Sequence, residues 1–467
     1  MSLHGKSALV LGLGESGLAM AQWLSRQGAH ARVADSRAAP PSAAELQRAV
    51  PGVALSTGPF TDRLLDGVDL IALSPGLPLD EPVVAEGARR GIPVVGEIEL
   101  FARALCESGT PGTPGKNENC KVIAITGTNG KTTTTALTGA LCRAAGQVTA
   151  VAGNIGPAAL AALMRCLDAG KLPQIWVLEL SSFQLETTLS LAADAAVVLN
   201  VSDDHLDRYA GLDSYAAAKA RIFAGGGAQA LNRQDARVMS MARAGARQLT
   251  FGLDAPVGED DFGFDGDWLL RGGERLLRAG ELAMSGRHNV ANALAALALC
   301  RAIGLPQAPL LPALRAFQGL PHRVERIADL DGVAWYDDSK GTNVGATVAA
   351  LEGLGRKVAL IAGGEGKAQD FSPLGPALAA HGRALVLIGR DAAQIEAAVA
   401  GCGIPVIHAR DMEQAVREAA AAARPGDAVL LSPACASFDM FRNYAHRAEV
   451  FIQAVRALAA ERQKEAS

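Results

Sequence analysis

The stretch KVIAITGTNGKTTTT, residues 121–135, contains the residue types that bind the phosphates of a nucleotide. An apolar run leads into a loop made of Gly127, Thr128, Asn129, Gly130, Lys131, Thr132 and Thr133. In a phosphate loop the backbone amides surround a phosphate, the lysine reaches the β- and γ-phosphate oxygens, and a hydroxyl ligates Mg²⁺. The usual spacing needs glycine where Ile125 stands, so this loop is a shorter variant. ATP binding is favoured over a chance Gly-Lys-Thr turn.

Two later segments could supply ligands for the metal of such a site. IWVLELSSFQLE contains an apolar run ending at Glu179, and strands of this kind deliver an acid to the metal at their carboxyl end. NVSDDHLDRY places Asp203, Asp204 and His205 side by side after another apolar run. Because Mg²⁺ prefers oxygen ligands, His205 could equally be a surface loop residue.

An earlier glycine loop, SALVLGLGESGLA at residues 7–19, has the Gly12-x-Gly14-x-x-Gly17 spacing of a dinucleotide-binding fingerprint. Glycines permit the sharp strand-to-helix turn and the close approach of backbone to phosphate. A following apolar run, ARVADS, ends with Asp35 at the place of a carboxylate that binds a ribose hydroxyl. The loop predicts a nucleotide site and leaves open whether the ligand is NAD or another nucleotide diphosphate.

Composition excludes several classes of protein. The 467 residues are 49% apolar, and 44 basic against 48 acidic residues give a net charge of −4, with no basic run of the kind that binds nucleic acid. No uninterrupted apolar stretch is long enough to enter a membrane, and the first residues lack a signal-peptide pattern. The seven cysteines show no C-x-x-C pair and are expected to be buried thiols. We expect a cytoplasmic monomer.

The elements that must hold these loops predict an α/β protein of three domains. Apolar runs without alternation indicate parallel sheets covered by helices on both faces. We expect a Rossmann-like domain over residues 1–108, a linker over 109–119, a P-loop ATPase-like domain over 120–318 and a second Rossmann-like, doubly wound domain over 319–467. Glycine-rich turns around residues 225–285 suggest a small antiparallel excursion.

Eight motifs together resemble the Mur ligases of peptidoglycan synthesis. They are GTNGKTT, GNIG, ELSSFQLE, SDDHLDRY, SGRHNVANALAA, LPHR, DDSKGTN and SPACASFD, in the family's order. The resemblance implies ATP-driven amide formation through an acyl phosphate and a tetrahedral intermediate. SSFQLE followed by HLDRY favours the branch that adds D-glutamate to UDP-N-acetylmuramoyl-L-alanine. The first glycine loop would then hold the uridine nucleotide of the sugar substrate and carry no redox chemistry.

The resemblance assigns roles to individual positions. The ATP-binding positions are Gly127, Thr128, Asn129, Gly130, Lys131, Thr132, Thr133, Asn292, Arg323 and Asp338. The sugar-nucleotide positions are Gly14, Glu15, Ser16, Asp35, Ser36, Arg37, Ser74, Gly76, Asn154, Ser181 and His205. The amino-acid positions are Lys340, Thr342, Lys367, Ser437 and Phe438. The magnesium positions are Thr132, Glu179, His205 and Lys219, and the catalytic positions are Lys131, Glu179, His205 and Lys219.

Lys219 in YAAAKARIF matches a lysine that the family carries in carbamylated form, as a carboxylate that binds a magnesium ion. Carbamylation needs the neutral amine, so burial of the lysine would favour it. An ordinary surface lysine is the alternative. With the carbamate, the metal at His205 would see mostly oxygen ligands.

Three positions depart from the family pattern. Glu365 stands where aspartate is expected, Tyr444 where phenylalanine is usual, and Ser36 where threonine is usual. Each change is conservative, so we expect the same reaction with a possible shift in affinity. The alternatives are another Mur or folylpolyglutamate-type ligase and an NAD-dependent dehydrogenase, which would leave the phosphate loop, Glu179 and Lys219 without a role.

Overall fold

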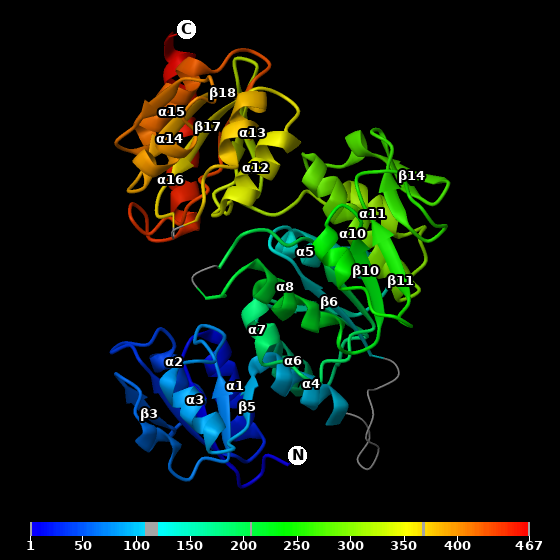
Figure 1. Ribbon diagram of the computed structural model, residues 1–467, viewed down its shortest axis with the longest axis vertical. Helices are drawn as coiled ribbons and strands as arrows, with labels where there is room; N and C mark the ends of the chain where they lie inside the picture. The colour runs from blue at the N-terminus through cyan, green and yellow to red at the C-terminus, as the bar shows by residue number, and fades with distance from the viewer. Residues whose placement is uncertain (1, 108–119, 206–207, 367–368, 466–467) are drawn as a thin grey trace.

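The structure, a computed structural model, describes residues 2–107, 120–205, 208–366 and 369–465. Three α/β domains follow one another along the chain, and each is built on its own sheet (Figure 1). The expected α/β class with three domains is confirmed. The predicted linker, 109–119, lies outside the described residues, and the domain limits stay predictions.

The N-terminal domain has a five-stranded parallel sheet in the order β3-β2-β1-β4-β5, the order of a Rossmann-like half. Its elements are β1 (Ser7–Leu11), α1 (Glu15–Arg26), β2 (His30–Asp35), α2 (Ala43–Ala49), β3 (Ala54–Thr57), the 3-10 helix η1 (Asp62–Leu65), β4 (Leu70–Leu73), α3 (Pro82–Arg89), β5 (Val94–Gly96) and α4 (Glu97–Glu107). The Gly12 loop lies at the carboxyl end of β1, the central strand, where ligands of such sheets bind.

The central domain has a nine-stranded sheet in the order β14-β13-β12-β11-β10-β9-β6-β8-β7. Its first half comprises β6 (Lys121–Thr126), α5 (Lys131–Ala144), β7 (Thr149–Gly153), α6 (Ala159–Asp168), β8 (Ile175–Glu179), α7 (Ser182–Glu186), β9 (Ala195–Val198), α8 (Leu212–Ala220) and η2 (Arg221–Phe223). Its second half comprises β10 (Ala228–Asn232), α9 (Ala236–Ser240), β11 (Gln248–Phe251), β12 (Phe262–Phe264), β13 (Trp268–Arg271), β14 (Glu274–Arg278), η3 (Ala279–Glu281), α10 (Arg287–Ala302) and α11 (Leu310–Ala316).

Successive residues of the central strands enter two separate cores, because side chains alternate across a sheet. In β8, Trp176 and Leu178 pack on the side of α4 and α6, while Ile175 and Val177 pack on the side of α5 and α10. Both faces of the sheet are therefore covered, which explains why these strands are apolar without alternation.

The antiparallel excursion is shorter than the sequence suggested. Strands β10 and β11 continue the parallel sheet, and only β12, β13 and β14 form antiparallel pairs. Glycine-rich turns mark both kinds of connection in this region, so composition alone did not separate them.

The C-terminal domain has a six-stranded sheet in the order β15-β16-β20-β17-β18-β19, parallel except for the pair of β15 and β16. Its elements are β15 (Glu325–Leu330), β16 (Val333–Asp337), α12 (Val344–Gly353), β17 (Val358–Gly363), α13 (Leu374–His381), β18 (Gly382–Ile388), α14 (Ala392–Ala398), β19 (Val406–His408), α15 (Met412–Ala422), β20 (Ala428–Leu431) and α16 (Tyr444–Glu465). Helices α12, α13 and α14 cover one face of the sheet, and α15 and α16 cover the other.

Helix α4 joins the first two domains through a shared core. It leaves β5 of the N-terminal sheet and packs beside α6 under the central domain (Figure 1). The ring of Phe101 meets Trp176 of β8 edge-on, with centroids 5.0 Å apart. Such a pair stabilises by about 0.5–1.5 kcal/mol beyond the buried area. No helix in the described residues is long and apolar enough to cross a bilayer.

Candidate active site

The phosphate loop lies between β6 and α5, as its sequence predicted. Gly130 precedes the first residue of α5 with φ +84°, and a Cβ there would lie 2.4 Å from Oδ1 of Asn292, so only glycine fits. Asn200, after β9, braces the loop: its Oδ1 accepts from the Asn129 amide at 2.8 Å and its carbonyl oxygen accepts from the Thr128 amide at 2.9 Å. The amides at the start of α5 form an anion-binding end.

Lys131 folds back over this loop. Its ammonium donates hydrogen bonds to the carbonyl oxygens of Gly127 at 2.9 Å and Thr128 at 2.7 Å. Burial lowers the pKa of Lys131, while the charges of Glu179 and Asp204 oppose that shift. The cation is therefore held where a triphosphate on the loop would meet it.

Glu179 ends β8 as a buried carboxylate with one oxygen left over. Its Oε1 accepts from Nδ2 of Asn154 at 2.6 Å, whereas its Oε2 is buried without a hydrogen-bond partner among the described residues. Asn154 belongs to the GNIG loop, and its own amide donates to the Glu179 carbonyl oxygen at 2.8 Å. An unpaired buried carboxylate oxygen is costly, and a cation beside it would remove that cost.

His205 has a backbone φ of +55°, an uncommon value outside glycine. Its ring packs edge-on against Phe183 with centroids 4.7 Å apart, and its Nε2 lies 3.7 Å from Oδ2 of Asp204. The imidazole ring is therefore held between Phe183 of α7 and the carboxylate of Asp204.

Lys219, on α8, is almost completely buried, with 1% of its surface exposed. Its Nζ donates to the carbonyl oxygen of Gly127 at 2.9 Å and lies 4.3 Å from the ring centroid of Tyr215. Burial, helped by the charge of Lys131, lowers the pKa of Lys219 well below that of a free lysine. The surface-lysine alternative does not fit this environment.

A cavity of 310 Å³ lies between the central and C-terminal domains and is lined by six of the ten predicted ATP positions. Asn129, Gly130, Thr133, Asn292, Arg323 and Asp338 line it, together with Lys340. Arg323 reaches across and donates from Nη2 to Oγ1 of Thr132 at 2.6 Å. Burial raises the pKa of Asp338 to about 7, although the hydrogen bond that Ser432 Oγ donates to this carboxylate at 2.7 Å lowers the pKa and opposes the shift.

In the N-terminal domain, the two turns predicted to face phosphate, the Gly12 loop and the turn of Ser74 and Gly76, lie next to each other. A Cβ on Gly12 would lie 2.9 Å from Cβ of Ser74. Asp35 holds the glycine loop in place: its Oδ2 accepts from the Leu13 amide at 2.6 Å, and Arg37 donates to both carboxylate oxygens. These bonds, with Arg37 first, lower the pKa of Asp35 to about 2.

Glu15, a predicted sugar-nucleotide residue, makes a hydrogen bond to the central domain. Its Oε1 accepts from the Ala158 amide at 2.9 Å, immediately before α6. Glu97, at the start of α4, accepts from the Leu160 amide of the same helix. The side chain of Glu15 therefore links the first glycine loop to the central domain. Roles for Gly14, Ser16 and Ser36 stay predictions.

Four of the five predicted amino-acid positions lie on two loops of the C-terminal domain, one after β16 and one after β20. The Lys340 ammonium lies 3.9 Å from the ring centroid of Tyr444, the position that departs from the family pattern. Ser437 is buried and Phe438 is 68% exposed. Lys367 lies outside the described residues. Thr342 lies in the same loop as Lys340, and its amide donates a hydrogen bond to the Lys340 carbonyl oxygen at 2.9 Å.

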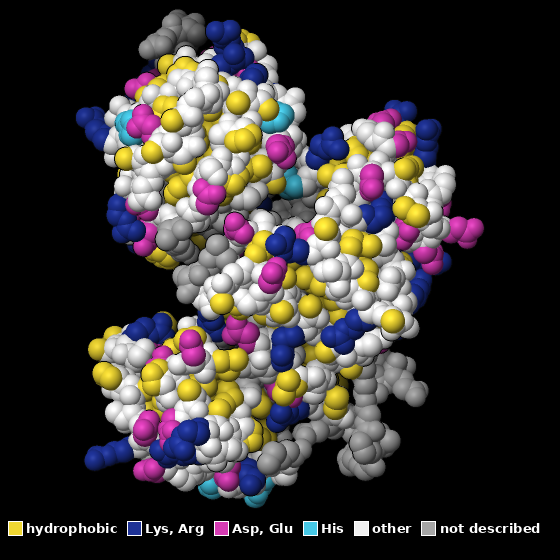
Figure 2. Space-filling view, viewed as in Figure 1, with side chains coloured by type: hydrophobic (Ala, Val, Ile, Leu, Met, Phe, Trp, Pro, Cys, Tyr) yellow, Lys and Arg dark blue, Asp and Glu magenta, His cyan; other side chains and the backbone are white. Residues whose placement is uncertain are grey.

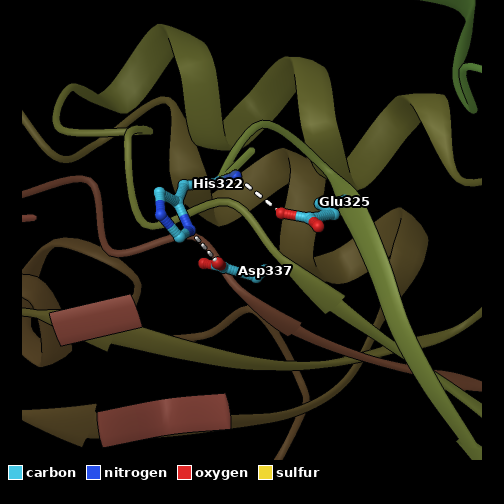
Figure 3. A group of neighbouring side chains, drawn as sticks. All are labelled: His322, Glu325 and Asp337. Carbon is cyan, nitrogen blue, oxygen red and sulfur yellow. Dashed lines mark hydrogen bonds and ion pairs between the residues drawn. The ribbon is translucent and has the colours of Figure 1, made fainter. Parts of the chain in front are cut away.

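His322, beside Arg323, belongs to a compact group with Glu325 and Asp337 (Figure 3). Its possible ligand atoms lie within 4.8 Å of one another, but they are already hydrogen-bonded: Nδ1 of His322 lies 2.6 Å from Oδ2 of Asp337, and Glu325 accepts from the His322 amide at 2.9 Å. These bonds brace the turn that presents Arg323 to the phosphate loop.

Figure 2 shows a hollow between the N-terminal and C-terminal domains, with the central domain along its inner side. The predicted sugar-nucleotide residues belong mainly to one of these outer domains and the predicted amino-acid residues to the other. Both sets must meet ATP at the central domain for the expected chemistry.

Sequence reasoning assigned no role to Asn343, which caps α12 and bridges to the central domain. Its Oδ1 accepts from the Ala346 amide at 2.8 Å, and its Nδ2 lies 3.2 Å from Oδ1 of Asn129. An asparagine directly before an apolar helix is a capping signal, so the local role was readable from the sequence. The contact with the phosphate loop was not.

Comparison with known proteins identifies the family. Profiles described as the Mur ligase MurD-like N-terminal domain, the Mur ligase middle domain and the Mur ligase glutamate ligase domain match residues 6–96, 125–300 and 322–435. The chain is 59% identical over 468 residues to a UDP-N-acetylmuramoylalanine--D-glutamate ligase of Nitrosospira multiformis, covering 99% of this chain and 98% of the relative. It is 57% identical to the protein of the same name from Thiobacillus denitrificans, with the same coverage.

Solved structures show the same fold at lower identity. UDP-N-acetylmuramate-alanine ligase MurC of Thermotoga maritima has a TM-score of 0.59 at 18% identity, over 97% of this chain and 99% of that one. MurF of Acinetobacter baumannii has a TM-score of 0.58 at 19% identity, over 97% and 92%. The three profile matches and the full-length relatives define a three-domain ligase. The chain belongs to the Mur ligase family.

Proposed function

We propose that this protein uses ATP to join D-glutamate to UDP-N-acetylmuramoyl-L-alanine in the synthesis of peptidoglycan precursors. The observation that carries the proposal is the full-length identity of 59% and 57% to relatives named for this reaction. The phosphate loop, the buried carboxylate of Glu179 and the cavity lined by Arg323 and Asp338 supply the ATP site that it needs. A cytoplasmic location and a monomeric state belong to the same proposal.

The reaction begins when the carboxylate of the sugar substrate attacks the γ-phosphorus of ATP and ADP leaves. The amine of D-glutamate then attacks the acyl phosphate, and the tetrahedral intermediate expels phosphate and forms the amide. Lys131 and the amides of the phosphate loop neutralise charge that develops on the transferred oxygens. Lys340, Thr342, Lys367, Ser437 and Phe438 would hold the incoming amino acid, since a cation and hydroxyls can pair with its carboxylates.

We further propose that Mg²⁺ binds at Glu179, Thr132, His205 and a carbamylated Lys219. The unpaired Oε2 of Glu179 supports a cation there, and the Thr132 hydroxyl keeps a second lone pair beside the one used by Arg323. The buried, low-pKa amine of Lys219 supports carbamylation, because the neutral form reacts with CO₂. When bound, the metal would neutralise phosphate charge.

The proposal is tested by measuring phosphate release in bicarbonate buffer. The assay contains Mg-ATP, UDP-N-acetylmuramoyl-L-alanine and one amino acid at a time. Release with D-glutamate and much less with L-glutamate or L-alanine is the expected result. Release with another amino acid would keep the ligase chemistry but assign a specificity change, with Glu365 and Tyr444 as the first positions to revert. No release with any amino acid would refute the proposal.

A further inference from the structure

Arg208 spans the boundary between the N-terminal and central domains. Its Nη1 donates to the carbonyl oxygen of Pro75 at 2.9 Å, and its Nη2 donates to that of Leu77 at 3.0 Å. Nη2 also donates to Oε2 of Glu186, the last residue of α7, at 2.9 Å. Both charged side chains are largely buried, 14% and 15% exposed. One guanidinium therefore holds a turn of one domain against a helix of the other.

The planar guanidinium of Arg208 also stacks on an aromatic ring. Its central carbon lies 4.0 Å from the ring centroid of Phe183, and that ring also contacts the rings of His205 and Tyr209. The Arg208 amide also donates to the carbonyl oxygen of His205 at 3.0 Å. Arg208 thus connects the loop that carries a predicted metal ligand to the turn that carries Ser74 and Gly76.

The hydrogen bonds from Arg208 to the carbonyl oxygens of Pro75 and Leu77 fix the orientation of the turn of residues 74–77. In a trans peptide the C=O and the following N–H point in opposite directions, and the Pro75–Gly76 bond is trans. Because the Pro75 oxygen points at Arg208, the Gly76 amide points away from it. Gly76 is an exposed residue, and its amide has no acceptor in the part of the chain that the structure describes. Ser74, in the same turn, adjoins the Gly12 loop.

We propose that Arg208 is a positioning residue for the sugar nucleotide. It orients the turn of residues 74–77 so that the Gly76 amide is free for the pyrophosphate, and it ties this turn to the loop of His205 where the acyl end of the substrate reacts. The inference rests on the proposed function, because it deepens the role of the same site. Lysine cannot replace this arrangement, since one ammonium cannot supply the planar fork that bonds two carbonyls and a carboxylate while stacking on a ring.

The test uses Arg208→Lys and Arg208→Met in the full chain, with Arg221→Met as the matched control. Arg221 lines the same 450 Å³ cavity as Arg208, but among the described residues its side chain donates only to the carbonyl oxygens of Leu185 and Thr188, both in the central domain. For both Arg208 variants we expect the KM for UDP-N-acetylmuramoyl-L-alanine to rise about tenfold or more, and the KM values for ATP and D-glutamate to stay within about twofold. The control should leave all three KM values near those of the wild type.

Calorimetric titration of the sugar nucleotide without ATP gives a second readout, which should weaken by a similar factor in the Arg208 variants. An unchanged KM and affinity for the sugar nucleotide, an equal rise for all three substrates, or the same effect in Arg221→Met would overturn the inference. If Arg208→Met does not fold, Arg208→Lys decides the outcome. Failure of the proposed function is distinct, because the wild type itself would then release no phosphate.

Discussion

The side-chain nitrogen of Lys219 lies 2.9 Å from the carbonyl oxygen of Gly127, the first glycine of the phosphate loop. The contact brings α8 against the nucleotide site although 92 residues separate the two positions. It also places the amine out of contact with solvent, beside the ring of Tyr215 and near the charge of Lys131. A lysine in this setting is poised to be neutral.

Carbamylation of Lys219 is the first prediction. The pKa of its amine is lowered in the folded state, so the unfolded chain binds more protons between the two pKa values and stability rises with pH across that window. Enzyme freed of CO₂ should lose activity and regain it with bicarbonate, and ¹³C-bicarbonate should give a carbamate NMR signal. Lys219→Arg should abolish that signal and lower kcat by about 100-fold or more.

Lys357→Arg is the control for this experiment, because Lys357 is an exposed lysine that donates to Ala380. It should keep both the signal and the activity. A carbamate signal that persists in Lys219→Arg, or activity indifferent to bicarbonate, would contradict the assignment.

The reach of Arg323 to Thr132 supports a second prediction. Arg323→Lys should raise the KM for ATP by about tenfold, because a hydrogen bond to a charged group contributes about 1.5–3 kcal/mol and the guanidinium fork is lost. Steady-state kinetics at saturating sugar nucleotide and D-glutamate measure it. Arg326→Lys, three residues on and paired at the surface with Asp329, should leave this KM unchanged. Equal effects in the two variants would argue against a role in binding ATP.

Glu97 and Glu99 give a third prediction, since the structure shifts their pKa values in opposite directions. Burial raises the pKa of Glu97 from 4.5 to about 7. The folded state therefore keeps a proton that the unfolded chain loses, and stability falls as pH rises from 4.5 through 7, by about 3 kcal/mol in total. Glu97→Gln should remove this penalty, so its advantage over the wild type should grow with pH in denaturant titrations from pH 5 to 8.

Glu99 is the matched control, two residues away on α4. Burial opposes its ionisation, but hydrogen bonds from Leu189 and Ser190 lower its pKa overall. Its ionised form therefore stabilises the protein above the unfolded pKa, and Glu99→Gln should be destabilised at neutral pH by an amount that shrinks as pH falls through the folded pKa. The same pH trend in both variants would show that the two environments do not differ as described.

Tyr444 supports a fourth prediction about the amino-acid end. Its ring lies 3.9 Å from the Lys340 ammonium, and a cation–π contact contributes about 0.5–2 kcal/mol. Tyr444→Leu should therefore raise the KM for D-glutamate by about two- to thirtyfold, as Lys340 loses its support. Tyr444→Phe, which restores the residue usual in the family, keeps the ring and should change this KM little. A large effect of Tyr444→Phe would instead assign a role to the hydroxyl.

The local parts of the site were predictable because they depend on neighbours in sequence. An apolar run followed by Gly127 to Thr133 has the residue types of a strand, a glycine turn and a helix start, although the strand β6 finds its hydrogen-bond partners in β8 and β9. The same holds for Gly12 after β1 and for Glu179 at the end of β8. Pairing partners were not predictable at this level: Asp35 binds the Leu13 amide, and Glu15 binds the Ala158 amide of another domain.

By itself, the sequence determined the α/β class, the three domains in their order and the residues able to bind phosphates. These follow from uninterrupted apolar runs and from glycine turns, both of which are features of a few neighbouring residues. Only the tertiary structure decided that Arg323 meets Thr132 across 191 positions, that Lys219 is buried, and that Arg208 holds a turn 131 to 133 positions away. Such contacts depend on how whole sheets and helices pack, and packing also sets the burial that shifts the pKa values of Glu97, Lys219 and Asp338.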